Sequence, residues 1–227
     1  MDSSELQKLA RYARSMREAG FALLLASGLL ALFLFVPLAP RNTLSEANSR
    51  SLTSATPPAF PPVSLEAKAA IVYDLVTGET LYAQNADAQL PLASLTKLLT
   101  VYAALRELPP TTLITIPADA IGLDGPRAFS VGQMFTLADL ARLTLTASLN
   151  DGAAAIASAT AAHQQISQNE MLAGAAAALN LSQTYAVNGS GLDASRSVSG
   201  GYCSAPHLAI LAGALVEKAA DIAAATP

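Results

Sequence analysis

The sequence has no tryptophan, one cysteine and two histidines among its 227 residues. With only Cys203 present, a disulfide bond within the chain is excluded, and we interpret this residue as a small buried side chain. His163 and His207 share no ligand spacing with a carboxylate or thiol, so no metal site is expected.

Charged residues make up 13% of the chain and the net charge is -4, which excludes a nucleic-acid-binding protein. Apolar residues, mainly alanine and leucine, make up 52%, so we expect an ordered chain with closely packed helices.

The first 39 residues combine positive charge with one long apolar run. Basic residues recur between Lys8 and Arg17, and residues 21–39 contain no charge. Such a run is about long enough to cross the hydrocarbon core of a bilayer as a helix, and positive charge before a first span stays on the cytoplasmic side. We therefore expect a cytoplasmic segment at residues 1–20 and a single transmembrane signal anchor at residues 21–39, with the rest of the chain outside the cytoplasm. The alternative is a secreted protein released by cleavage of a long signal peptide.

Residues 40–64 are rich in serine, threonine and proline and lack periodicity, which predicts an extended linker. The remaining residues, 65–227, are enough for one folded domain. At its start, residues 69–84 show two short β-branched or aromatic runs on either side of Thr77-Gly78. This pattern predicts an antiparallel hairpin.

Apolar spacing predicts a helical block after the hairpin. Residues 94–108 should form a helix that is buried nearly all round and ends before Pro109. A short strand is expected at residues 113–116. Further helices are predicted at residues 136–146, 151–162, 167–179 and 204–218. A hairpin followed by a helical block gives an α+β fold.

Ser94 and Lys97 form a Ser-x-x-Lys motif in the first turn of the predicted helix 94–108. Residues three apart share one face of a helix, so the lysine amine can reach the serine hydroxyl. Burial lowers the pKa of a lysine, and a neutral lysine can take the serine proton and activate the nucleophile. The N–H of Ser94, near the start of the helix, could help to bind an oxyanion. The alternative is that Ser94 is only an N-cap and Lys97 a surface lysine.

A second motif, Ser148-Leu149-Asn150, lies at the predicted turn between two helices. A hydroxyl there could relay a proton near Lys97, and the amide could donate to a substrate carbonyl. The alternative is that Ser148 or Asn150 caps the helix at residues 151–162.

These motifs, with Val-Asn-Gly-Ser-Gly-Leu-Asp at residues 187–193 and Tyr-Cys-Ser-Ala at residues 202–205, resemble the D-alanyl-D-alanine carboxypeptidases. These enzymes are low-molecular-mass penicillin-binding proteins related to the serine β-lactamases. The resemblance covers most of residues 68–218 and implies a β-lactamase/transpeptidase-like fold, whose antiparallel sheet begins with the hairpin.

The resemblance also implies a reaction and its residues. Ser94 would attack the penultimate D-alanine carbonyl of a peptidoglycan pentapeptide ending in D-Ala-D-Ala, and Lys97 would accept the serine proton. Ser148 would relay a proton to the leaving group, and Asn150 would hold the substrate peptide. β-Lactam antibiotics would acylate Ser94. No cofactor is implied.

The family's third motif, Lys-Thr-Gly on a strand facing the nucleophile, does not occur in the sequence, because no lysine is followed by Thr-Gly or Ser-Gly. We therefore expect a chain truncated before this motif, with the C-terminal strands missing and an exposed sheet edge, and we do not expect full activity from it. Open alternatives are a membrane-anchored peptidoglycan-binding or scaffolding protein with an impaired site, a D-alanyl-D-alanine endopeptidase and a β-lactamase. We interpret Glu170 as a helix-capping residue rather than a deacylating base.

Overall fold

The computed structural model of the protein describes residues 65–224. The expected cytoplasmic segment, signal anchor and linker at residues 1–20, 21–39 and 40–64 lie outside these residues. Within residues 65–224, no helix is long and apolar enough to cross a membrane.

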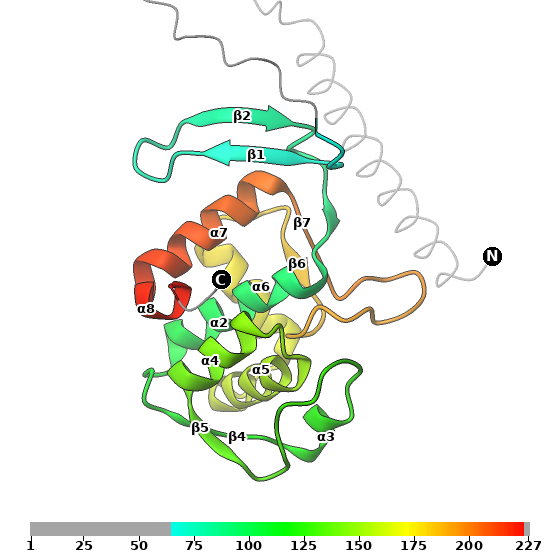
Figure 1. The fold of residues 1–227 in the computed structure, drawn as a ribbon, viewed down its shortest axis with the longest axis vertical. Coiled ribbons are helices and arrows are strands. Elements are labelled where there is room, and N and C mark those ends of the chain that lie inside the picture. The colour runs from blue at the N-terminus through cyan, green and yellow to red at the C-terminus, as the bar shows by residue number, and fades with distance from the viewer. Residues whose placement is uncertain (1–64, 225–227) are drawn as a thin grey trace, which may run out of the picture. The chain divides into compact units, whose positions relative to one another are not determined.

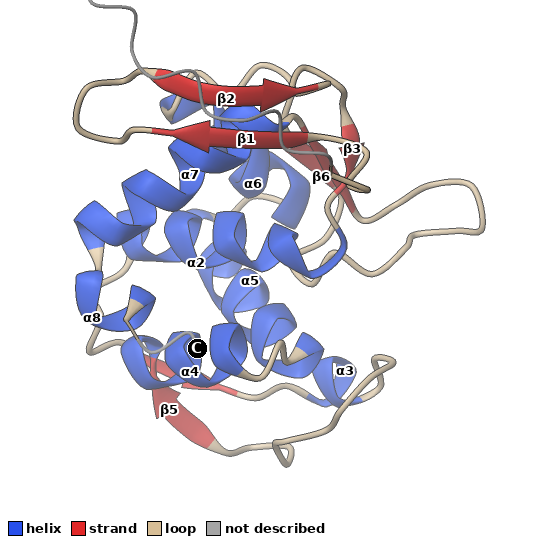
Figure 2. Ribbon diagram, turned by 45° about the horizontal axis from the view of Figure 1, so that its top comes forward, coloured by secondary structure: helices blue, strands red, loops and turns tan. Residues whose placement is uncertain are grey.

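The described part is an α+β arrangement in which helices fill the space between small antiparallel sheets (Figures 1 and 2). The strands are β1 (Ala70–Tyr73), β2 (Thr80–Gln84), β3 (Leu90–Pro91), β4 (Leu113–Thr115), β5 (Met134–Thr136), β6 (Tyr185–Ala186) and β7 (Gly201–Cys203). The helices are the 3-10 turn η1 (Ala93–Leu95), α2 (Thr96–Glu107), α3 (Ala118–Ile121), α4 (Leu137–Thr146), α5 (Asn150–Gln164), α6 (Gln168–Ala178), α7 (Ala205–Lys218) and α8 (Ala220–Ala223).

The predicted hairpin is confirmed as β1 and β2, which pair antiparallel. The Asp74 carboxylate accepts the Val76 N–H at 2.8 Å, and Gly78 takes a positive φ of 74°, so this side chain and this glycine shape the turn. Helix α7 lies along the hairpin (Figure 1). Among the described residues the hairpin pairs with no third strand, and Val72 and Leu81 are exposed.

Helix α2 is the centre of the core and contacts α4, α5, α6 and α7. Leu99, Val101 and Ala104 are fully buried on different sides of this helix. This confirms that the predicted helix is buried nearly all round. It ends at Glu107, and the two prolines that follow remove the N–H groups that would extend it.

The other predicted helices are confirmed within one or two residues at their ends, with α5 beginning and ending slightly outside its predicted range. Thr136 caps α4 by accepting the Asp139 N–H, and Ser167 and Glu170 form a capping box at α6. The interpretation of Glu170 as a capping residue is therefore confirmed. Its hydrogen bonds with Ser167 lower the pKa of the Glu170 carboxyl.

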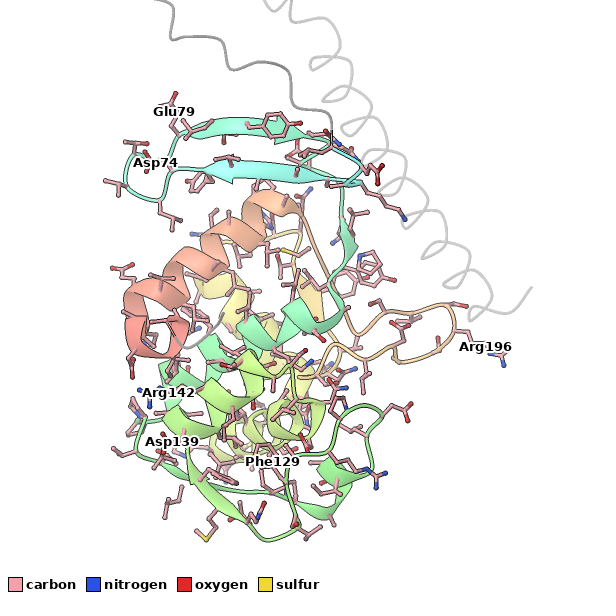
Figure 3. The ribbon with its side chains drawn as sticks, in the orientation of Figure 1. Asp74, Glu79, Phe129, Asp139, Arg142 and Arg196 are labelled. Atoms are coloured by element: carbon pink, nitrogen blue, oxygen red, sulfur yellow. The ribbon has the colours of Figure 1, made fainter. Side chains whose placement is uncertain are left out.

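Among the described residues, one surface ion pair joins helices that are distant in the sequence. Arg142 on α4 pairs with Asp139 at the start of the same helix (Figure 3). It also pairs with Asp221 on α8. Arg196 lies on the long loop between β6 and β7 (Figure 3).

Candidate active site

Ser94, Lys97 and Ser148 come together at one cleft of about 470 Å³. The cleft is lined by Leu92, Ala93, Ser94, Leu95, Lys97, Leu98, Leu145 and Ser148. Ser94 belongs to η1, Lys97 to the first turn of α2, and Ser148 to the turn between α4 and α5. Two motifs about fifty residues apart in the sequence thus meet, as the sequence predicted.

The lysine amine lies between the two hydroxyls. Lys97 Nζ donates to Ser94 Oγ at 2.9 Å and lies 3.5 Å from Ser148 Oγ. Ser94 and Ser148 are exposed, whereas Lys97 is only 1% exposed. The two hydroxyls are therefore open to a molecule in the cleft, while the Lys97 amine is shielded from solvent.

Burial has a direct effect on the protonation of Lys97. Removing the ammonium group from water disfavours its charged form and lowers the pKa of Lys97 from 10.5 to about 8. Lys97 is the only ionisable side chain among the residues that line the cleft. With this pKa, about one tenth of the Lys97 amines are neutral at pH 7 and about half at pH 8, and the neutral form is the one that a general base requires.

The capping alternatives for the serines are wrong in this structure. The N-cap of α2 is Leu95 and the N-cap of α5 is Leu149, and neither helix start has a side-chain cap. Ser94 and Ser148 lie one residue before these caps. Lys97 is buried, so it is not a surface lysine either.

Asn150 lies beside the cleft but does not line it. Its Nδ2 donates to the Asp124 carbonyl oxygen at 2.6 Å, and its side chain is 8% exposed. The neighbouring Asp151 carboxylate accepts the Ala128 N–H at 3.1 Å. Together these two residues tie the loop before β5 to the start of α5. The structure therefore brings three of the four predicted site residues together and places the fourth against this loop.

Two backbone features of the site were not predicted. Ala93 and Ser148 have positive φ angles of 47° and 55°. This left-handed conformation is uncommon for residues with a Cβ and often marks functional sites. An alanine or a serine in a sequence does not indicate a left-handed backbone conformation, as a glycine or an asparagine would. Both residues lie at the points where the chain presents a hydroxyl to the cleft.

Cys203 is buried, as interpreted from the sequence. Its sulfur lies 2.9 Å from Thr184 Oγ1, and burial raises the pKa of its thiol. A protonated, buried thiol is a poor nucleophile. Cys203 therefore acts as a packing residue of β7.

The Peptidase_S11 family, described as D-alanyl-D-alanine carboxypeptidase, matches residues 53–226. Among curated proteins, the D-alanyl-D-alanine carboxypeptidase DacC of Escherichia coli (strain K12) is 32% identical over 204 residues, which are 85% of this chain and 46% of DacC. The chain thus spans less than half the length of this relative.

Solved structures agree in fold. The D-alanyl-D-alanine carboxypeptidase DacD from Francisella tularensis superposes with a TM-score of 0.63 at 25% identity, covering 70% of this chain and 39% of that one. Penicillin-Binding Protein D2 from Listeria monocytogenes in the cefotaxime-bound form superposes with a TM-score of 0.57 at 30% identity, covering 70% of this chain and 65% of that one. The fold is therefore α+β and of the penicillin-binding protein type.

Proposed function

This chain belongs to the D-alanyl-D-alanine carboxypeptidase family, and on that premise we propose that it carries the acylation site of a serine-type D-Ala-D-Ala carboxypeptidase acting on peptidoglycan stem peptides. The observation that supports this most strongly is the hydrogen bond between a buried Lys97 and an exposed Ser94. A buried amine beside a reachable hydroxyl is the pairing that covalent catalysis by a serine requires.

In the proposed reaction, Ser94 Oγ bonds to the carbonyl carbon of the penultimate D-alanine as Lys97 Nζ takes the hydroxyl proton. Collapse of the tetrahedral intermediate breaks the peptide bond. Ser148, which is 3.5 Å from Lys97 Nζ, gives its hydroxyl proton to the leaving D-alanine nitrogen and receives in turn the proton that Lys97 took from Ser94. Water then adds to the Ser94 ester, and its hydrolysis releases the shortened peptide and restores the serine hydroxyl. Asn150 is proposed to hold the substrate peptide once it turns from Asp124.

We propose that β-lactams react at the same serine. The Listeria relative has been solved with cefotaxime and with ampicillin bound. Opening of the β-lactam ring by Ser94 would give an ester of the same kind as the peptide does. Hydrolysis of this ester is slow when water cannot reach it, so a stable covalent adduct is expected.

The function is tested by release of D-alanine from a synthetic peptide ending in L-Lys-D-Ala-D-Ala. We expect release that stops after incubation with benzylpenicillin. Release from a cross-linked muropeptide alone would instead support an endopeptidase, and repeated turnover of the penicillin would support a β-lactamase. Binding of muropeptide with neither release nor acylation would support a non-catalytic scaffold.

Acylation is expected to depend on pH through Lys97. Because the base must be neutral and the pKa of Lys97 is about 8, the acylation rate constant should rise about tenfold per pH unit below pH 8 and level off above it. Stopped-flow measurements with a chromogenic cephalosporin between pH 6 and pH 9.5 would show this. A rate constant that does not change between pH 6 and pH 8 would rule out Lys97 as the base.

We further propose, from the sequence alone, that residues 21–39 anchor the chain in a bacterial cytoplasmic membrane with residues 40–227 outside the cytoplasm. The uncharged run behind a basic segment supports this location. Carbonate extraction of membranes should leave the chain in the membrane fraction. A mature N-terminus near residue 40 would instead indicate signal cleavage and secretion.

A further inference from the structure

The backbone immediately before Ser94 needs support from its surroundings. Ala93 has a φ of 47°, a conformation that residues with a Cβ adopt only where neighbouring groups hold it. One residue earlier, the Leu92 N–H donates to the Gly201 carbonyl oxygen at 2.9 Å. This bond fixes Leu92 but does not act on Ala93 itself.

Residues 188–192, named here the 188–192 turn, contact Ala93 directly. Gly191 packs so closely that a Cβ on it would overlap the Ala93 carbonyl oxygen and come within 2.8 Å of Thr96 Oγ1. Gly191 also has a φ of 80°. Only glycine combines this φ with such a close approach. The backbone of Ala93 is therefore confined by the backbone of Gly191.

One side chain organises the 188–192 turn. Asn188 Oδ1 accepts the Gly191 N–H at 2.8 Å and the N–H and hydroxyl of Ser190 at 3.2 and 2.9 Å. Its Nδ2 donates to the Leu192 carbonyl oxygen at 2.8 Å. Asn188 thus sets the position of the glycine that confines Ala93.

The same turn is attached to two helices of the site. Thr100 on α2 donates its hydroxyl to the Gly189 carbonyl oxygen at 2.7 Å. A Cβ on Gly189 would come within 2.5 Å of Ala157 Cβ on α5. Helix α2 carries Lys97, and α5 follows the turn that carries Ser148. The 188–192 turn therefore contacts the residue before Ser94, the helix that carries Lys97 and the helix that follows Ser148.

We infer that Asn188 is a positioning residue for Ser94, acting through Gly191 and the backbone of Ala93; this inference rests on the proposed acylation function. The 188–192 turn keeps the Ser94 hydroxyl at hydrogen-bonding distance from Lys97 Nζ. Without the Asn188 bonds, Ala93 relaxes toward a negative φ and Ser94 moves. Misplacement of a reacting group by about 1 Å costs on the order of 10²-fold in rate.

Three variants test this inference. Asn188→Ala removes four hydrogen bonds from the turn, and we expect a limiting acylation rate constant at least about tenfold lower, with an unchanged dissociation constant for the initial penicillin complex. Asn188→Asp keeps the oxygen that accepts the Gly191 and Ser190 N–H groups but loses the donor to the Leu192 carbonyl oxygen, so it should recover part of the rate. Ser167→Ala removes the cap of α6 away from the cleft, so it should lower the melting temperature and leave the rate constant unchanged.

The inference would be overturned if the folded fraction of Asn188→Ala had the same limiting acylation rate constant as the wild type. If the wild-type chain does not react with penicillin at all, the proposed function has failed, and the turn is then judged by the ¹³Cα and ¹³Cβ chemical shifts of Ala93. A shift toward ordinary helical or extended values in Asn188→Ala supports the inference. Unchanged shifts overturn it.

Discussion

Replacing Lys97 by methionine is expected to slow acylation by a penicillin about 10²–10⁴-fold, the usual contribution of a general base, and to make the folded chain more stable at neutral pH. The rate falls because no group remains to take the Ser94 proton. The stability rises because methionine fills a similar volume without a buried charge.

The size of this stability gain and its pH dependence follow from the lowered pKa of Lys97. The pKa of Lys97 is about 8 in the folded chain and near 10.5 when exposed, so charging it costs the folded state up to about 3 kcal/mol below pH 8. Between pH 8 and pH 10.5 the unfolded chain binds a proton that the folded chain does not. Wild-type stability therefore rises with pH in this window, and the advantage of Lys97→Met disappears across it.

Urea unfolding at pH 7 and pH 10, together with acylation rates, would check both effects. Lys68→Met is the matched control, because Lys68 is exposed and is not among the residues that line the cleft, so neither property should change. If Lys97→Met acylates within tenfold of the wild type, Lys97 is not the base.

Ser94→Ala is expected to abolish covalent labelling by a fluorescent penicillin. Removing the nucleophile of a serine enzyme usually costs about 10³-fold or more, because no other group can form the acyl bond. The substitution also removes the 2.9 Å hydrogen-bond acceptor of the buried Lys97 amine, so a modest fall in the melting temperature is expected. Gel fluorescence after a fixed incubation measures the labelling.

Ser182→Ala is a suitable control for this experiment, because Ser182 is an exposed serine outside the cleft. It should label like the wild type. Labelling of Ser94→Ala at the wild-type rate would mean that another side chain is the nucleophile.

Much of the fold could be predicted because its main elements carry strong local signals. Helix α2 has apolar residues on all sides and two prolines at its end, and α6 has a capping box at Ser167 and Glu170. The strands β6 and β7 have only two or three residues, so they are too short to show an alternating pattern, and they were not predicted.

The candidate site was predictable only in part. Ser94 and Lys97 are three residues apart in a segment predicted to be helical, so their contact could be predicted from the sequence. Asn150 hydrogen-bonds to a carbonyl 26 residues earlier, and Ala93, which has a positive φ, packs against Gly191. Neither contact can be predicted from the neighbouring residues in the sequence, because both arise from tertiary packing.

The most direct measurement is the intact mass of the chain after incubation with benzylpenicillin, followed by proteolysis and mapping of the modified peptide. The expected result is a mass increase of one penicillin per chain, located on Ser94. No mass increase, or an adduct on any other residue, would contradict the assignment of Ser94 as the nucleophile activated by Lys97.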